Sequence, residues 1–303
     1  MGKVSNELKM KLYYKIYEQL YESPATCNVE LSRRTNLCRN TVARYLNEMY
    51  ASGILTSPFL SLKSVQPYAE YISLLNFDSM HFVSPRLKTF PGMVNTTHCA
   101  LDWNQLAVAS KPLNFQSLKY FRSQLFQGRI ERVVTPKCAL SSGVEIPSLS
   151  LIPKRNPPKH CIIPWNEEGW DLYNLVRSNT RAKATPLLKK VKVRYDVFSS
   201  WKKTLAQYTT THLLFYPHGR GAYTHWYFLV KSPYDLSTLF QQWPASCVLM
   251  ELGMHILLKI PVCSPLQLQT LLTLFEDFQD NSIIQLSFHA VGLDTPNNRA
   301  RIP

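Results

Sequence analysis

The stretch that decides the fold is residues 31–55, LSRRTNLCRNTVARYLNEMYASGIL. Its second part predicts a helix that begins after Cys38, because apolar side chains recur there at spacings of three, one and three and would form one buried face. These side chains are Val42, Tyr45, Leu46 and Met49. A shorter helix carrying Leu31 precedes it, and Asn36-Leu37 forms the turn between the two. The pattern therefore predicts a helix-turn-helix.

The opposite face of the second helix is polar and basic. Arginine, asparagine and threonine are residue types that reach phosphates and base edges when a helix lies in the major groove of DNA. Gly53 can end this helix because glycine takes the left-handed conformation without a steric penalty, and Ile54-Leu55 can then start the strand of a winged variant. The predicted DNA contacts are Arg33, Arg34, Arg39, Asn40, Thr41 and Arg44. An ordinary basic pair of surface helices remains the alternative.

Residues 6–21 predict a further helix, which completes a three-helix domain with a wing at residues 57–62. Its inward face would carry Leu8, Leu12, Ile16 and Leu20. It also has a tyrosine stripe formed by Tyr13, Tyr14, Tyr17 and Tyr21. Such a stripe could stack on bases, but its helical spacing favours packing in a core or a dimer.

A small αβ domain is predicted next. Its strands would lie at residues 69–77, 94–101, 103–109 and 130–134, and its helices at residues 80–90 and 115–126. In the second helix Leu118, Phe121 and Leu125 would face inward. The order βαββαβ favours an antiparallel sheet with two helices on one face, the ferredoxin-like plan. The five prolines of residues 141–164 exclude a helix there and predict a linker.

The second half of the chain repeats this pattern. Helices are predicted at residues 167–178, 187–193 and 194–208, and the apolar positions match the first copy at an offset of 156, with Leu31 on Leu187 and Val42 on Phe198. A second βαββαβ pattern follows, with strands at 225–230, 247–251, 255–260 and 282–291 and helices at 234–243 and after residue 264. An internal repeat changes the whole fold prediction. The predicted fold class is α+β, with two winged helix-turn-helix domains alternating with two ferredoxin-like βαββαβ domains.

The boundaries follow from these patterns. The predicted segments are a winged helix-turn-helix at 1–66, an αβ domain at 67–140, a Pro-rich linker at 141–164, a second, divergent winged helix-turn-helix at 165–222, a second αβ domain at 223–293 and a tail at 294–303. The motif His218 to Tyr223, HGRGAY, has too few glycines to cradle a phosphate and is interpreted as the tip of the second wing.

The charge of the chain points to a polyanion partner. With 34 Lys+Arg against 20 Asp+Glu the formal net charge is +14, which favours nucleic acid. An anionic membrane surface could also explain the charge, but no apolar run reaches the roughly 18 residues that a membrane span needs. Residues 1–65 carry +4 and residues 150–220 carry +9, whereas residues 223–292 carry −3. The charge therefore lies mostly in the helix-turn-helix segments, as expected for a DNA-binding face with separate αβ modules.

The second helix-turn-helix is basic in a different way. Lysine meets phosphates as a point charge and reads bases less well than arginine or asparagine. The second copy is therefore predicted to hold the DNA backbone while the first reads sequence. The residues predicted to hold the backbone are Lys189, Lys190, Lys192, Arg194 and Lys202.

Enzyme and metal motifs find little support. The seven cysteines are scattered and never form a CxxC pair, which argues against a zinc site and a secreted disulfide framework and favours reduced thiols in the cytoplasm. No GxGxxG, GxxxxGK[ST], GxSxG or HExxH motif is present. We therefore predict no catalytic residue, no metal site and no cofactor.

The order of a winged helix-turn-helix and a βαββαβ domain resembles the Lrp/AsnC family of regulators. Residues 31–55 are similar to the DNA-binding helices of that family, and residues 253–260, GMHILLKI, are similar to its glycine-containing β-hairpin. The resemblance implies a ligand site at Gly253 and His255 for a small-molecule effector, although His255 stands where the family often has Asp. It also implies self-association through the αβ domains. A chain with two such domains could be its own pseudo-dimer and address two unequal half-sites in double-stranded DNA.

The same architecture occurs in siroheme decarboxylases, whose αβ domain binds a tetrapyrrole. The candidate groups for an anionic macrocycle here are His98, His212, His218, His225 and His255. They form no cluster in the sequence, and the basic charge lies in the other domains. The sequence therefore predicts a transcription regulator and not an enzyme, with a tetrapyrrole enzyme as the alternative.

Overall fold

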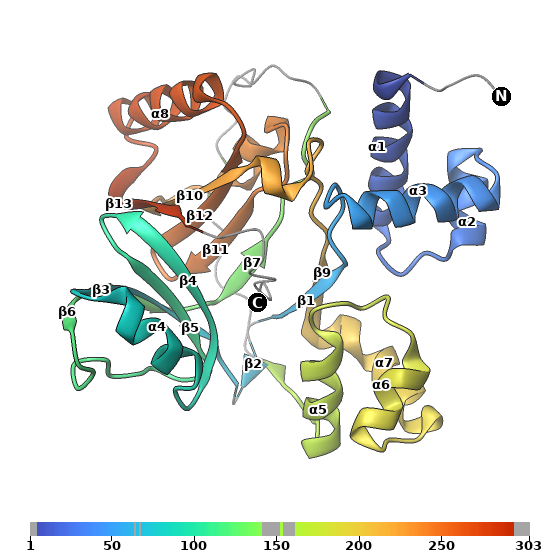
Figure 1. The fold of residues 1–303 in the computed structure, drawn as a ribbon, viewed down its shortest axis with the longest axis horizontal. Coiled ribbons are helices and arrows are strands. Elements are labelled where there is room, and N and C mark those ends of the chain that lie inside the picture. Colours follow the sequence, from blue (N-terminus) through green and yellow to red (C-terminus); the bar gives the residue numbers. More distant parts are fainter. Residues whose placement is uncertain (1–4, 64, 67, 141–151, 154–160, 294–303) are drawn as a thin grey trace.

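The structure is a computed structural model, and it describes residues 5–63, 65–66, 68–140, 152–153 and 161–293. Most of the predicted linker and the whole predicted tail lie outside these residues. The described chain consists of two three-helix units and two αβ halves (Figure 1). The two helical units lie on one side of the molecule and the αβ halves on the other.

The first helical unit contains α1 (Asn6–Glu22), α2 (Asn28–Thr35) and α3 (Arg39–Ala51). The Ser5 side chain caps α1 by accepting a hydrogen bond from the Leu8 backbone N–H at 3.2 Å, which satisfies one otherwise unpaired donor. Asn36, at the turn after α2, takes a left-handed φ of 55°. The predicted apolar stripe is confirmed, since Val42, Tyr45, Leu46 and Met49 are all buried.

The second helical unit contains α5 (Glu167–Val176), α6 (Ala184–Val191) and α7 (Tyr195–Tyr208). Helices α6 and α7 begin 156 residues after α2 and α3, respectively. The turn residue Lys192 has a φ of 56°, and its counterpart 156 residues earlier, Asn36, has a φ of 55°. The buried residues of α5 also match those of α1 at this offset; they are Gly169, Leu172, Tyr173 and Val176 against Tyr13, Ile16, Tyr17 and Leu20.

The strands that follow the two units pair with each other. Strand β1 (Phe59–Leu62) is antiparallel to β9 (Thr209–His212), so the two helical units share a two-stranded sheet between them (Figure 1). The prediction of separate wings is therefore wrong. The motif at residues 218–223 forms a 3₁₀ turn, η1 (Arg220–Ala222), and the Arg220 N–H donates to the Gly53 carbonyl at 2.9 Å. The predicted wing tip thus packs against the end of the first helix-turn-helix.

The first αβ half contains β3 (Tyr71–Phe77), α4 (Met80–Lys88), β4 (Met93–Leu101), β5 (Gln105–Ala109) and β6 (Phe121–Arg129). Its antiparallel strands have the order β6-β3-β5-β4. The helix predicted over 115–126 is wrong, because β6 occupies part of this stretch. Phe121 and Leu125 alternate there with the exposed Arg122, as expected for a strand, while Leu118 packs beside α4 where the helix was expected.

The second αβ half contains β10 (Thr224–Lys231), η2 (Leu236–Gln242), β11 (Val248–Leu252), β12 (His255–Val262), α8 (Pro265–Asp280) and β13 (Gln285–Gly292). Its strand order, β13-β10-β12-β11, repeats that of the first half. The helix predicted at 234–243 is a 3₁₀ helix, η2, between Pro233 and Pro244.

The two halves form one nine-stranded sheet, because β4 pairs with β13. Strand β7 (Arg132–Val134) pairs with β11 of the second half, so its predicted place as the last strand of the first half is wrong. Since β6 and β7 are consecutive, the two ends of the strand order are joined and the sheet folds back on itself. Leu74 and Leu106 of one half then share a core with Leu257 of the other.

The outer faces of the sheet are covered by helices. Val83 and Leu87 of α4 pack on the first half, and Phe275 and Phe278 of α8 pack on the second. Strands β5, β11 and β12 are therefore buried on both faces along nearly their whole length. A short parallel pair, β2 (Val65–Gln66) with β8 (Cys161–Ile162), joins the ends of the first helical unit and the linker. The mixed α+β class, with a helix-turn-helix followed by αβ modules, is confirmed.

Two further findings concern the whole described chain. All seven cysteines are free thiols in the structure. No helix among the described residues combines the length and the apolar composition that crossing a bilayer requires.

Candidate nucleic-acid interface

The outer face of α3 presents the side chains predicted to contact DNA. Arg39, Asn40 and Arg44 are exposed, and Thr41 is partly exposed, because the other face of the helix is buried. The exposed Asn47 lies on the same face, one turn after Arg44. The Arg44 guanidinium lies 5.1 Å from the centroid of the Tyr45 ring and its side chain is 62% exposed, so it can leave the ring to meet an anion.

Thr41 is engaged at the start of this helix. Its hydroxyl lies 2.9 Å from the thiol of Cys38, the residue that precedes α3. The Thr41 hydroxyl and nearby backbone N–H groups lower the pKa of the Cys38 thiol. The predicted contact of Thr41 with DNA would require its hydroxyl to leave Cys38.

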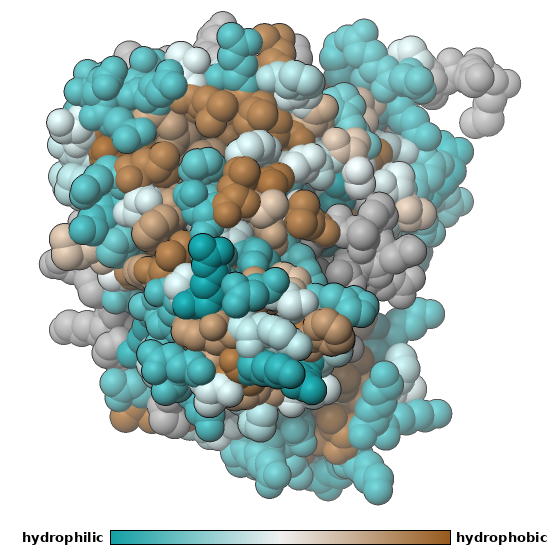
Figure 2. Space-filling model, turned by 60° about the vertical axis from the view of Figure 1, so that its left-hand side comes forward, coloured by the Kyte–Doolittle hydropathy of each residue, from teal (hydrophilic) through white to brown (hydrophobic). Residues whose placement is uncertain are grey.

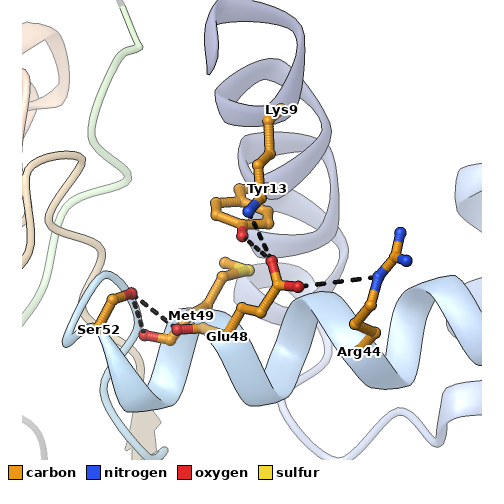
Figure 3. A network of polar contacts seen from close by, with 6 residues as sticks. All are labelled: Lys9, Tyr13, Arg44, Glu48, Met49 and Ser52. Carbon is orange, nitrogen blue, oxygen red and sulfur yellow. Dashed lines mark hydrogen bonds and ion pairs between the residues drawn. The ribbon is translucent and has the colours of Figure 1, made fainter. Parts of the chain in front are cut away.

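A polar network fixes the C-terminal part of α3 against α1. Glu48 accepts from Lys9 at 2.8 Å and from the Tyr13 hydroxyl at 2.5 Å, and Arg44 lies 3.8 Å away on its other side (Figure 3). The hydrogen bond from Lys9 is the main cause that lowers the pKa of Glu48, so the carboxylate stays ionised. This network was not predicted, although Glu48 four residues after Arg44 is a signal for an ion pair along a helix.

The two arginines of α2 share one acidic neighbour. Arg34 lies 2.9 Å from Glu30 and Arg33 lies 3.7 Å from it, and the two side chains are 40% and 77% exposed. Exposed pairs of this kind contribute about 0–1 kcal/mol, so both arginines can turn to a phosphate at small cost.

The predicted basic residues of the second unit lie around α6 and α7. Lys189 and Lys190 are exposed on the last turn of α6, and Lys192 occupies the left-handed turn. Lys202 is exposed on α7. Arg194 precedes α7 and pairs with Asp196 at 3.0 Å.

Helix α7 does not repeat the side chains of α3. At the offset of 156, Tyr195, Asp196 and Ser200 occupy the positions of Arg39, Asn40 and Arg44. A residue-by-residue comparison of the two copies could have revealed this difference from the sequence.

The two helical units are tied to each other. Arg181, in the loop before α6, donates at 2.8 Å to the carbonyl of Thr26 in the loop before α2, and at 3.2 Å to the side chain of Asn28, the first residue of α2. The shared β1–β9 sheet provides the second link. The two helix-turn-helix motifs therefore have a fixed spacing within one chain.

A buried histidine lies beside this shared sheet. His212 of β9 lies 2.6 Å from the Ser61 hydroxyl of β1 and 3.1 Å from that of Thr135. Burial lowers the pKa of His212 to about 4, so the imidazole is neutral at physiological pH. This role was not predicted, because nothing local in the sequence joins residues so far apart.

The tyrosine stripe of α1 has a packing role. The Tyr17 ring stacks on Phe215 with centroids 4.8 Å apart, and the Tyr14 and Tyr21 hydroxyls donate to the carbonyls of Cys138 and Thr135 at 2.7 and 2.8 Å. The packing interpretation is therefore correct, and α1 is attached to the segment after β7.

The predicted ligand residues lie at the β11–β12 hairpin. Gly253 is exposed in the turn with a φ of 67°, and His255 packs on the Phe126 ring of the other half at 4.9 Å. Of the candidate histidines, His98 contacts the Ser84 hydroxyl and His212 contacts that of Ser61. Nowhere in the described ranges do three His, Cys, Asp or Glu side chains gather as a metal site would require.

Comparison with known protein families gives a match at the helices of the first unit. A family model described as winged helix-turn-helix DNA-binding matches residues 14–56, which include α2 and α3. No curated protein sequence is detectably similar to the chain.

Several solved structures resemble the chain. The siroheme decarboxylase NirDL has 10% identity and a TM-score of 0.50, and the match covers 93% of this chain and 91% of that one. AsnC of E. coli has 12% identity and a TM-score of 0.32, covering 43% of this chain and 94% of that one. A transcriptional regulator from Neisseria meningitidis, solved as a complex with L-Met, has 17% identity and a TM-score of 0.33, covering 40% of this chain and 88% of that one. At this identity the chain-wide match to NirDL shows a shared fold, and the family match shows a DNA-binding type of domain at residues 14–56.

Proposed function

We propose that the protein is a sequence-specific DNA-binding transcription regulator that works in the cytoplasm. The observation that carries this proposal is the outer face of α3, where Arg39, Asn40 and Arg44 are exposed within the segment that matches winged helix-turn-helix DNA-binding domains. Arg44 and Arg39 would read bases in the major groove, because arginine forms paired hydrogen bonds with guanine. Arg33 and Arg34 would contact the adjacent phosphates.

The two helical units would address two unequal half-sites. Their helices match at one offset, which supports an origin by duplication, but α7 carries Tyr195, Asp196 and Ser200 where α3 carries its contacts. The second unit would therefore hold the phosphate backbone through Lys189, Lys190, Lys192, Arg194 and Lys202. Because Arg181 and the β1–β9 sheet fix the spacing, one chain would protect an asymmetric site.

The αβ halves would serve assembly and sensing. Figure 2 shows apolar side chains gathered in patches on the side of the molecule that these halves form. In these halves Leu101 and Leu266 are 57% and 72% exposed, and self-association through the αβ halves would cover such apolar side chains. A small-molecule effector at the Gly253–His255 hairpin is part of the same proposal.

Binding to random duplex DNA at increasing salt tests this function. Each phosphate contact releases counterions, so the logarithm of affinity should fall steeply and linearly with the logarithm of salt concentration. Selection from a random pool should then give a defined, asymmetric sequence. Weak binding to duplex DNA even at low salt would contradict the proposal.

A tetrapyrrole enzyme is the second candidate, and the observation that favours it is the similarity to NirDL along 93% of this chain. The absorption spectrum of the purified protein separates the two functions. A colourless protein whose spectrum is unchanged by siroheme supports the regulator. A porphyrin-like spectrum with weak duplex binding would support the enzyme.

A further inference from the structure

The second helical unit contains an open groove of about 460 Å³ beside α7. It is lined by Pro164, Trp165, Asp196, Val197, Ser200, Trp201 and Thr204. Trp165 is partly exposed, and its ring centroid lies 5.6 Å from that of Trp201. The groove therefore combines an aromatic wall with one carboxylate at its edge.

The first unit has a polar network at the same positions. Each residue that lines the groove has a counterpart 156 residues earlier, and the counterparts include Lys9, Arg44, Tyr45 and Glu48. In the first unit Lys9 and Tyr13 of α1 bond to Glu48 and close the side of α3 (Figure 3). In the second unit Trp165 stands in place of Lys9, and Gly169 stands in place of Tyr13.

Gly169 is needed for this arrangement. A Cβ on Gly169 would lie 2.8 Å from the Trp165 side chain, so a larger residue would displace the indole. The Trp165 ring nitrogen donates to the Thr204 hydroxyl at 3.4 Å, which turns the indole along α7. The polar network of the first unit is thus replaced by the partly exposed indole of Trp165, which packs beside the buried Trp201.

The surroundings of the groove are basic. Residues 183–208 contain seven Lys and Arg residues and a single acidic residue, Asp196. Arg194 pairs with Asp196 at 3.0 Å at one end of the groove. Lys203 is exposed and follows Ser200 by three positions, which places it on the same side of the helix. The charge complements a chain of phosphates.

We propose that this groove binds an unstacked base of single-stranded nucleic acid. Aromatic side chains stack on bases with little sequence preference, and a basic rim follows the backbone. The base would stack on Trp165, and Arg194 and Lys203 would contact the flanking phosphates. The Asp196 carboxylate would accept a hydrogen bond from the exocyclic amine of cytosine or adenine. This site is separate from the α3 surface, and it shares only Arg194 with the duplex contacts proposed for the second unit.

A bulky substitution in the groove tests the proposal. Ser200→Trp fills the groove from an exposed position of α7, while Ala206→Trp adds the same bulk at an exposed position on another side of that helix. The affinities of a fluorescein-labelled (dC)12 strand and of a random duplex of the same length are measured by anisotropy for both variants and for the unmodified chain.

The stacking energy of one base sets the expected effect. Ser200→Trp should weaken single-strand binding about tenfold or more, whereas Ala206→Trp and all duplex affinities should change less than about twofold. Arg44→Ala should weaken duplex binding and leave single-strand affinity nearly unchanged. The two variants therefore distinguish failure of the duplex-reading function from failure of this site. Equal single-strand affinities for Ser200→Trp and Ala206→Trp would overturn the proposal.

A second measurement needs no substitution. Ultraviolet crosslinking of a single strand carrying 5-iodocytosine, mapped by mass spectrometry, should give adducts at Trp165 or Trp201. Adducts found only on α2 and α3 would overturn the proposal. Saturating the groove with an uncharged aromatic compound such as indole should weaken single-strand binding. Unchanged single-strand affinity with indole bound there would also overturn the proposal.

Discussion

Acidification should destabilise the protein at the sheet that joins the two helical units. The size of this effect follows from the pKa of His212. His212 is 2% exposed and contacts Ser61 of β1 and Thr135. Its pKa is lowered to about 4 in the folded protein by burial, against about 6.5 in the unfolded chain. A lowered histidine pKa means that the unfolded chain takes up the proton first. The stabilisation is therefore complete above pH 6.5 and is lost as pH falls toward 4.

The linkage relation converts these pKa values into a free energy. Between pH 8 and pH 5 the contribution of His212 to the free energy of unfolding should fall by about 2 kcal/mol. The buried His225 has its pKa lowered as well, by burial and by nearby Lys259 and Arg220, and acts in the same direction. The contribution of His212 to the pH dependence of the unfolding free energy is isolated by comparing the wild type with a variant that has no titrating group at this position.

The assay is urea unfolding of the wild type and of His212→Gln at several pH values from 8 to 5. Glutamine keeps a donor and an acceptor for the two hydroxyls but does not titrate. The difference in unfolding free energy between the two proteins should shrink by about 2 kcal/mol over this range. Parallel curves for wild type and His212→Gln would refute the reasoning.

Three further predictions concern the packing of the helical units. Gly219→Ala should destabilise the protein by about 2 kcal/mol in urea unfolding, because Gly219 has a φ of 79° and the new Cβ would lie 2.6 Å from the Ser52 carbonyl oxygen. The control is Gly221→Ala, whose Cβ would meet nothing within 4 Å, and it should change the unfolding free energy little. Arg181→Ala should cost about 1–2 kcal/mol through its lost hydrogen bonds and should speed proteolysis between the two units, and unchanged proteolysis would argue against the clamp. Leu31→Ala should cost about 2–5 kcal/mol, since Leu31 is fully buried, and a smaller loss would contradict the core assigned to the first unit.

Local patterns predicted the helical units well. The buried stripe of α3 has a single period and is bounded by turn residues, so its position and its exposed face could both be read from the sequence. The match between the units followed from the same apolar spacing, because each helix needs one buried face.

The strands were harder to place where pairing decides the structure. The stretch around Phe121 has apolar residues at spacings that suit a helix as well as a strand, and the free edge of β3 favours the strand. Arg132–Val134 was recognised as a strand, but its partner β11 lies more than a hundred residues away. The same holds for β1 and β9, whose pairing turns two predicted wings into one shared sheet.

In the candidate site, too, features set by helical periodicity could be predicted, whereas features set by packing between helices could not. Exposure of Arg39 and Arg44 follows from helical periodicity and could be predicted. The contacts of Lys9 and Tyr13 with Glu48 depend on how α1 crosses α3, and the groove beside α7 depends on Trp165 filling the space over Gly169. These features need the packing angle between helices, which residue spacing does not specify.

The central claim is that α3 reads base sequence, and the most direct test is the affinity of Arg44→Ala for a selected duplex and for a random duplex of equal length at one salt concentration. If Arg44 contacts a base, the selected duplex should lose about 1–3 kcal/mol of binding energy while the random duplex loses much less. Lys202→Ala, as a backbone contact, should weaken both equally. Equal losses on both duplexes for Arg44→Ala would contradict the account.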